Sequence, residues 1–340
     1  MKVERMKERT KISVAVITYN QESTIRQTLD SILMQKGNFD LELVIGEDSS
    51  TDNTYAICKE YAERYPDIVK LLPNTYNLGI MANYARVIEA CTGEFIGDIA
   101  GDDFYCDDHA LEKQMRYLQS HDNVGVMASN GYNYYVLRDE KVPGLNPVFE
   151  AEQEWVKSYY FSPEHMEGAC LAPVGIMYRA DLLKKYIDFK EILRRKLPVE
   201  DYPIQAILSQ HTHFACLPDL LVTYRIYSSS ATFLSFDSPR YLDYYRGLAE
   251  TRRYLNELFP NDACVTEVML QEQLFYKEFL LYLHQLNYKK AKMLIANHSS
   301  LIDNSPKMRQ AKRFTRTWIH FFIVHIVKEY KYKQALKHNT

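Results

Sequence analysis

This chain of 340 residues has few cysteines, no long apolar run and no excess of positive charge. Its six cysteines are scattered, without a C-x-x-C pair or the spacing of a metal site, which is typical of a reducing compartment and not of a disulfide scaffold. No stretch approaches the ~20 apolar residues of a membrane-spanning helix. Lys and Arg number 41 against 44 Asp and Glu, so no nucleic-acid partner is indicated. We expect a cytoplasmic protein.

Two nucleotide-binding signatures are also missing. No G-x-G-x-x-G follows the first predicted strand, which argues against an NAD-type pyrophosphate turn. No P-loop is present either, which argues against ATP-driven phosphoryl transfer.

The most informative stretch that is present runs from Glu94 to Asp108. Its short apolar run, residues 95–100, predicts a buried strand that ends at Gly101. Asp102 and Asp103 follow at once, and two neighbouring carboxylates favour pairing with a cation or with hydrogen-bond donors. The alternative is a polar turn, because Asp is also an ordinary turn and helix-capping residue.

Short strands and helices alternate along the first half of the chain. Strands are predicted at 12–17, 41–45 and 68–72, and a helix follows Asn77-Leu78-Gly79. This alternation predicts an α/β fold with a doubly wound, mostly parallel sheet.

The rest of the chain predicts a change of architecture. Residues 132–163 have an irregular, aromatic pattern that favours loops and edge strands, and residues 214–217 and 221–226 predict two short strands. From about Pro239 the pattern is helical almost throughout. We therefore expect an N-terminal tail at 1–11, an α/β domain at 12–235 and a helical C-terminal region at 236–340.

Polar residues follow three of the predicted strands, namely Thr18-Tyr19-Asn20, Asp48 and Asp102-Asp103. In a parallel sheet these strand ends lie on the same edge, where ligands bind. Tyr19 could stack on a base, and Asp48 could accept a hydrogen bond from a base N–H. A divalent cation, Mn²⁺ or Mg²⁺, could join a diphosphate to Asp103.

Four segments in order resemble glycosyltransferase family 2, the inverting nucleotide-sugar enzymes of GT-A fold. They read VITYNQESTIRQTLDSILMQ, ELVIGEDSSTDNT, NLGIMANYARVIEACTGEFI and GDDFY, and the match spans roughly residues 12–117. The resemblance implies a nucleotide-sugar donor and a divalent metal held by Asp102 and Asp103. The residues that it places at the nucleotide sugar are Thr18, Tyr19, Asn20, Glu22, Asp48, Asn77, Gly79, Asn83 and Asp102.

Further along, LPVEDYPIQAIL resembles the region that supplies the catalytic base of the family, which gives that role to Asp201. Inversion requires a carboxylate on the face opposite the leaving group, where it takes the proton of the acceptor hydroxyl. The alternative is that Glu200 and Asp201 only cap the helix that Pro203 begins.

The chain departs from the family at two positions. Relatives often carry a carboxylate where this chain has Ala100, and a His where it has Tyr227, which weakens the expected metal site. His211 and His213 are interpreted as structural, and His165 as an acceptor contact.

We thus expect an inverting glycosyltransferase that moves a hexose or aminosugar, with UDP as the leading donor nucleotide. The acceptor would be a hydroxyl of a glycan or lipid-linked glycan in cell-surface polysaccharide or lipopolysaccharide synthesis. A sugar-nucleotide nucleotidyltransferase and a non-catalytic nucleotide-sugar binder or scaffold are the alternatives. Asp103→Ala is expected to remove metal-linked nucleotide binding and to leave the fold intact.

The C-terminal tail combines basic and apolar residues. Basic residues flank the apolar run 318–327, which is about 15 Å long as a helix and cannot span a bilayer. The run either docks on the protein or makes a peripheral contact with the inner membrane face through residues 309–337.

Overall fold

The computed structural model describes residues 9–165, 171–227, 236, 238–302 and 305–339. The chain divides into two compact units. Unit 1 comprises Met1–Tyr134, Asp139–Tyr160 and Gly168–Arg225, and unit 2 comprises Tyr135–Arg138, Phe161–Glu167 and Ile226–Thr340. The predicted boundary near Ser235 lies outside the described residues, as do residues 1–8 of the predicted tail.

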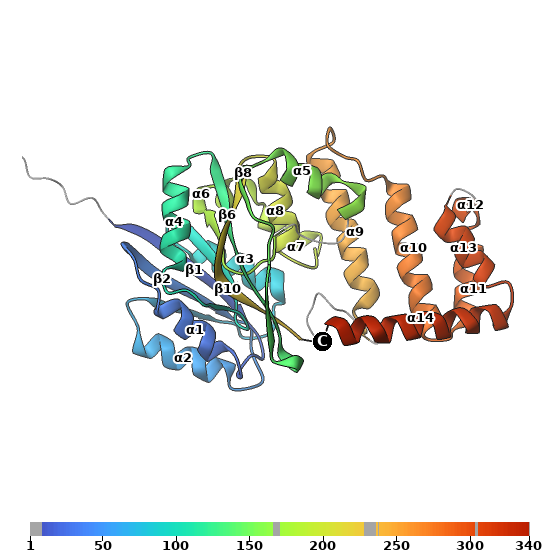
Figure 1. Cartoon of the computed structure of the whole chain (residues 1–340), viewed down its shortest axis with the longest axis horizontal. Helices are drawn as coiled ribbons and strands as arrows, with labels where there is room; N and C mark the ends of the chain where they lie inside the picture. Colours follow the sequence, from blue (N-terminus) through green and yellow to red (C-terminus); the bar gives the residue numbers. More distant parts are fainter. Residues whose placement is uncertain (1–8, 166–170, 228–235, 237, 303–304, 340) are drawn as a thin grey trace, which may run out of the picture. The chain divides into compact units, whose positions relative to one another are not determined.

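Unit 1 is built on one sheet with the strand order β3-β2-β1-β4-β9-β6-β10-β5, in which β7 pairs with β6 and β8 with β10 (Figure 1). Strands β3, β2, β1 and β4 are parallel to one another, whereas β9 is antiparallel to β4 and to β6. The predicted α/β class is confirmed. The strands are β1 (Thr10–Thr18), β2 (Phe39–Glu47), β3 (Val69–Pro73), β4 (Phe95–Ala100), β5 (Phe104–Tyr105), β6 (Val124–Tyr135), β7 (Glu140–Pro143), β8 (Phe149–Glu152), β9 (Ile176–Arg179) and β10 (His213–Ile226).

The helices of unit 1 pack their apolar faces on this sheet. In α1, Ile25, Leu29 and Ile32 recur at helical spacing and are fully buried. Helix α3 lies very close to β2 at Gly46. A Cβ atom on this residue would lie only 2.4 Å from the Val87 side chain, so glycine permits the approach. The helices are α1 (Ile25–Leu33), α2 (Thr54–Arg64), α3 (Ile80–Ala90), α4 (Ala110–Ser120), α5 (Glu154–Phe161), α6 (Ala180–Tyr186), α7 (Phe189–Arg194) and α8 (Asp201–Ser209).

The structure corrects two local predictions. The stretch 132–163, where loops and edge strands were expected, contains the helix α5 as well as the end of β6. The two short strands expected at 214–217 and 221–226 are one strand, β10. Pro218, which lies between the two predicted strands, is exposed within β10, where its missing N–H is tolerated.

Unit 2 is helical, as predicted. Its core joins Phe275 and Phe279 to Leu294 and Phe321 from later helices. In the part of the chain that the structure describes, no helix combines the length and the apolar character needed to cross a membrane. The helices are α9 (Tyr241–Leu258), α10 (Glu267–His284), α11 (Tyr288–Asn297), α12 (Ser299–Ile302), α13 (Pro306–Phe314) and α14 (Trp318–Asn339).

Candidate functional site

The ends of β1, β2 and β4 lie side by side, as the sequence predicts. Thr18 pairs with Glu47 across β1 and β2, and Ile17 pairs with Ala100 across β1 and β4. The residues that follow each strand therefore meet at one edge of the sheet, which is where open α/β sheets bind their ligands.

The loops after β1 and β2 are held together by predicted site residues. The Asn20 Oδ1 atom accepts a hydrogen bond of 2.8 Å from the Thr51 backbone N–H. Glu22 accepts one of 2.9 Å from the Asn53 backbone N–H. Thr18 is buried, whereas the Tyr19 side chain is 44% exposed. Asn20 and Glu22 thus shape the two loops, and Tyr19 is accessible to a ligand.

Asp48 organises the loop that precedes α3. Its Oδ1 atom accepts hydrogen bonds from the Asn74 side chain at 2.8 Å and from the Leu78 backbone N–H at 2.7 Å. Its Oδ2 atom accepts one of 2.9 Å from the Gly79 backbone N–H. The residue is only 3% exposed. A contact with a nucleotide base stays a prediction, because the contacts of the carboxylate here are with its own loop.

The predicted residues of the β3–α3 loop belong to the same network. Asn77 donates a hydrogen bond of 3.1 Å to the Asp48 carbonyl, and the buried Asn83 donates one of 2.8 Å to the Gly46 carbonyl. Gly79 has φ 85°, a conformation that favours glycine, and it immediately precedes α3. These residues fix the backbone beside the sheet edge at which β1, β2 and β4 end, which we call the strand-end edge.

Replacing Asp48 by Ala is expected to lower the free energy of unfolding by about 1–3 kcal/mol, since the Leu78 and Gly79 N–H groups lose their acceptor. Urea denaturation measures the change. Asp67→Ala, at an exposed acid that follows α2, is the matched control and should change little. An Asp48→Ala protein as stable as the control would contradict the assigned contacts.

Asp102 and Asp103 face different surroundings. Asp103 is 2% exposed, and its Oδ1 atom accepts a hydrogen bond of 2.7 Å from the Arg225 backbone N–H. Asp102 is more exposed. Burial raises the pKa of Asp102, and Arg225 counteracts this rise. Burial, followed by the charge of Asp102, raises the pKa of Asp103 well above its usual range. Asp102 is therefore the more accessible of the two carboxylates.

The expectation for Asp103→Ala changes with this geometry, and Arg225 takes part in the same contacts. Asp103→Ala would not leave the surroundings intact, because it removes the acceptor of a buried N–H on β10. Arg225 is buried, and its guanidinium contacts the Asp102 carbonyl and the Gln27 side chain and lies 4.7 Å from the centre of the Phe104 ring. It therefore braces the turn after β4.

Gly101 allows that turn to lie against β1. A Cβ there would lie 2.5 Å from Gln21 Oε1 and 2.7 Å from Thr18 Oγ1. The Gly101 carbonyl accepts hydrogen bonds of 3.0 Å from the Thr24 and Thr28 hydroxyls. A larger residue at 101 would therefore require the Gln21 and Thr18 side chains, or the turn itself, to shift.

Asp201 is the first residue of α8, and Glu200 precedes it. The Glu200 side chain makes no capping hydrogen bond, and Asp201 accepts one of 2.7 Å from the neighbouring Tyr202 N–H. Burial raises the pKa of both carboxyls, and in Glu200 the charges of Asp201 and Asp98 add to the effect. The interpretation that the pair only caps a helix is thus not supported for Glu200.

Asp98, in the middle of β4, is the residue that the sequence analysis missed. It is 7% exposed and pairs with Ile176 of β9. Burial raises the pKa of Asp98 to about 7; the neighbouring Tyr84 hydroxyl opposes this rise and Asp201 adds to it. The signal in the sequence was an Asp within a run predicted to be a buried strand, because acids are rarely buried without a partner. Asp98, Glu200 and Asp201 form one cluster, the acid cluster.

Asp98→Asn is expected to stabilise the protein at alkaline pH. Because the folded-state pKa of Asp98 is raised, its contribution to stability is full below about pH 4 and is lost as the pH rises through about 7. Asn cannot ionise, so the gain over wild type should grow by about 1–3 kcal/mol between pH 5 and pH 8. Urea denaturation at both pH values measures it. An equal change at both pH values, as expected for Asp67→Asn, would contradict the placement.

His211 and His213 make local contacts in unit 1. His211 stacks on Tyr186, with ring centres 3.7 Å apart, and the His213 backbone N–H donates to the Asn123 carbonyl, in line with structural roles. His165 belongs to unit 2, so its acceptor contact stays a prediction. Among the described residues, no three His, Cys, Asp or Glu side chains are grouped to hold a metal ion.

Comparison with known proteins identifies the family of this chain. A model described as Glycosyl transferase family 2 matches residues 13–187. The chain is 39% identical over 219 residues to Uncharacterized protein Rv1520 of Mycobacterium tuberculosis, which covers 63% of this chain and 58% of that protein. It is 35% identical over 119 residues to Putative glycosyltransferase EpsE of Bacillus subtilis, covering 35% of this chain and 42% of that protein. The chain thus spans about half the length of these relatives.

Solved structures share the fold. S. aureus TarS 1-349, solved in complex with UDP-GlcNAc, superposes with a TM-score of 0.56 and 19% identity over 96% of this chain and 92% of that one. GalNAc-T7, solved with UDP, GalNAc and Mn2+, gives a TM-score of 0.52 at 14% identity over 76% and 52%. The predicted GT-A fold is confirmed. Since the family model covers more than half of its residues, the chain belongs to glycosyl transferase family 2.

Proposed function

We propose that this protein is an inverting glycosyltransferase that uses a nucleoside diphosphate sugar, with UDP as the first candidate nucleotide. The acceptor is a hydroxyl of a glycan or lipid-linked glycan in cell-surface polysaccharide or lipopolysaccharide synthesis, on the cytoplasmic side. The observation that carries the proposal is the meeting of the β1, β2 and β4 ends beside Asp102, with the acid cluster in the same unit. Similarity to a dTDP-rhamnosyl transferase, RfbG of Shigella flexneri, supports sugar transfer (41% identity over 73 residues).

The donor nucleotide would lie along the strand-end edge. The exposed Tyr19 ring offers a stacking surface for the base. The loops fixed by Asn20, Glu22 and Asp48 offer backbone groups in a rigid arrangement. A preformed site of this kind binds with less ordering cost than flexible loops would.

The residues at Asp102 fit a divalent cation that also uses substrate oxygens. Mg²⁺ is usually bound by one or two carboxylates together with phosphates and water. Asp102 supplies a partly exposed carboxylate, and the remaining Oδ2 atom of Asp103 is a second candidate. When bound, the cation would neutralise charge on the leaving diphosphate. The expected Mn²⁺ or Mg²⁺ dependence is part of this proposal.

Asp201 is the proposed general base. Its raised pKa makes it a better proton acceptor than an ordinary Asp carboxylate, and the acceptor hydroxyl must lose a proton as the new bond forms. Burial is the cause of this rise, because it disfavours the ionised carboxylate. The acid cluster thus provides the base, and the strand-end edge binds the leaving group.

A donor screen tests the proposal. UDP-, GDP- and dTDP-sugars are incubated with the protein and Mn²⁺ or Mg²⁺, with and without glycan acceptors, and nucleoside diphosphate release is measured. We expect release from at least one donor. Nucleotide binding without release from any donor would instead identify a non-catalytic binder, the alternative that Ala100 and Tyr227 favour.

A further inference from the structure

One face of helix α14 is fixed against the rest of unit 2. Phe321 is fully buried, with ring centres 6.2 Å from Phe279 and 5.5 Å from Tyr288. His325 Nδ1 lies 2.8 Å from the Leu283 carbonyl, and Glu329 contacts His284. These contacts determine which side chains of α14 remain outside. The tail therefore docks on unit 2 along this side of α14, which is one of the two alternatives that the sequence left open.

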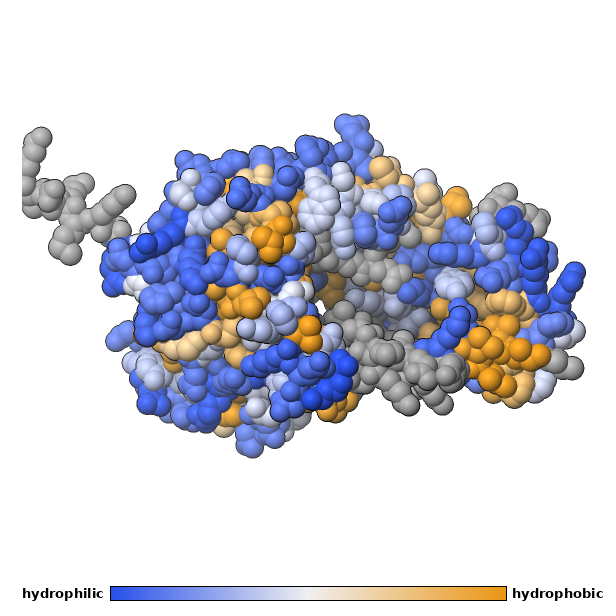
Figure 2. All heavy atoms as spheres, in the orientation of Figure 1, coloured by the Kyte–Doolittle hydropathy of each residue, from blue (hydrophilic) through white to orange (hydrophobic). Residues whose placement is uncertain are grey.

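The outer side of the same helix is apolar. Ile323, Ile326 and Val327 are 53%, 51% and 49% exposed, and their spacing of three and four residues places them on one side. Trp318, in the first turn of α14, is 52% exposed and stacks on Phe322. We call Ile323, Ile326 and Val327 the apolar face of α14, and Trp318 is a further exposed apolar side chain at the start of the helix. Figure 2 shows apolar side chains gathered at the place that the first half of α14 occupies in Figure 1.

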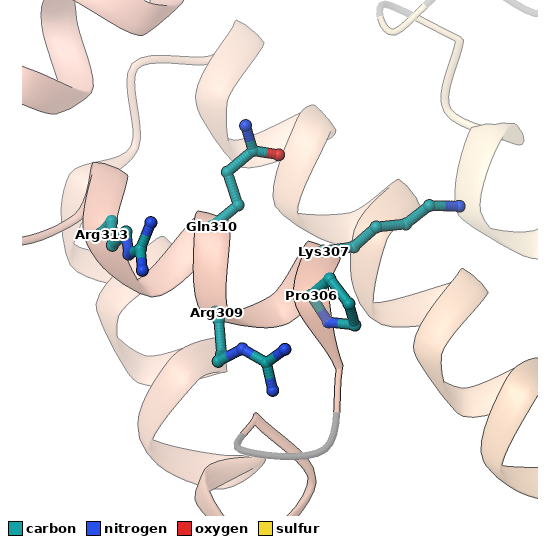
Figure 3. A pocket seen from close by; sticks show the side chains of 5 residues that line it. All are labelled: Pro306, Lys307, Arg309, Gln310 and Arg313. Carbon is teal, nitrogen blue, oxygen red and sulfur yellow. The ribbon is translucent and has the colours of Figure 1, made fainter.

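The surrounding segment is strongly basic. Residues 305–340 contain nine Lys and Arg and one acid, Glu329. Removing these from the totals of 41 and 44 leaves 32 basic and 43 acidic residues in the first 304, so the positive charge is local. Lys307, Arg309 and Arg313 of α13 line a hollow of about 420 Å³. Figure 3 shows their side chains pointing away from the helix in different directions. Lys312, Arg316, Lys328 and Lys331 are also exposed.

Together these observations select one kind of partner. A nucleic acid would use the basic residues and leave the apolar face in water. A second copy of this chain would bring another set of like charges to the same surface. A bilayer of anionic lipid offers both an apolar interior and phosphate groups at its surface. Exposed Trp is also typical of the membrane–water interface.

We infer that α13 and the first half of α14 form a peripheral membrane surface. The apolar face of α14 enters the interfacial region of an anionic phospholipid bilayer, and the Lys and Arg side chains of both helices contact lipid phosphates. Residues 318–327 rise about 15 Å, so the helix lies in the interface and does not cross it. This inference goes beyond the proposed function and does not depend on it.

Sedimentation with vesicles of phosphatidylcholine containing about 30% phosphatidylglycerol tests the inference with the full chain. We expect binding at low salt, much weaker binding at 0.5 M NaCl, and little binding to pure phosphatidylcholine. The combined variant Ile323→Ser, Ile326→Ser and Val327→Ser should lower the bound fraction at least about tenfold. Val268→Ser, which replaces an equally exposed valine of α10, is the matched control and should bind like wild type.

Tryptophan fluorescence gives a second, direct readout. Trp155 and Trp318 are the two tryptophans of the chain, so Trp155→Phe leaves Trp318 as the reporter. Its emission should shift to the blue when anionic vesicles are added. Circular dichroism melting confirms that each variant folds. No vesicle binding at low salt, or equal binding by the triple-serine variant, would overturn the inference. Self-association in solution that the triple-serine variant abolished would also overturn it. Binding of nucleic acid instead of lipid, if the same variant abolished that binding, would overturn it as well.

Discussion

Asp201→Asn is expected to lower turnover by about 10²–10⁴-fold while leaving UDP binding near the wild-type value. The substitution preserves the volume of the side chain but removes the group that accepts the proton. UDP release under saturating donor and acceptor, together with isothermal titration of UDP, separates the two effects. The binding result is essential, because it distinguishes the loss of a base from a collapse of the site.

Glu200→Gln is the matched control for this prediction. Glu200 lies beside Asp201 at the start of α8, and its pKa is raised further by the charges of Asp201 and Asp98. A group that holds its proton so strongly is a poor base at neutral pH. Glu200→Gln should therefore retain most of the turnover. If Glu200→Gln instead abolished turnover and Asp201→Asn did not, the base would be Glu200.

The pH profile follows from the same cluster. Asp201 must be ionised to act as a base, and burial raises its pKa above the ordinary Asp value. Turnover should therefore fall on the acid side at a higher pH than an exposed Asp would give.

Asp102→Asn is expected to weaken Mn²⁺-linked UDP binding by at least about 10–100-fold, because the substitution removes the accessible carboxylate of the pair. UDP titration with Mn²⁺ and with EDTA measures the metal-linked part. Asp67→Asn removes an equal charge at an exposed position and serves as the control. Unchanged Mn²⁺-linked affinity in Asp102→Asn would show that the metal, if used, is held elsewhere.

The sequence predicts the parallel part of the fold well, for physical reasons. Residues 12–17 are apolar and mostly β-branched except for Ser13 and Ala15, and residues 12–16 are all buried, which is typical of a strand covered on both faces. The rule that parallel strands end at one edge of the sheet then predicts that the polar residues after β1, β2 and β4 lie close together. In unit 2, the helical pattern expected from about Pro239 corresponds to the helices α9 to α14.

The details that the sequence could not give are those that tertiary contacts decide. Asp102 and Asp103 are identical in type, and only the position of Arg225 on β10 shows which one is turned inward. Likewise, the presence of an Asp at position 48 does not show whether its carboxylate binds a nucleotide base or the backbone of its own loop. Asp98 lies far from Asp201 along the chain, and the two act on each other only because the fold brings β4 and the start of α8 together.

The stereochemistry of transfer tests the central claim most directly. Proton NMR of the sugar in the first product formed from a donor with an α-linked sugar reports the anomeric configuration of the new bond. A base at Asp201 acting opposite the leaving diphosphate predicts the β product from wild type and a rate of product formation lowered by about 10²–10⁴-fold in Asp201→Asn. An α product from wild type, or a β product formed at the wild-type rate by Asp201→Asn, would contradict the account.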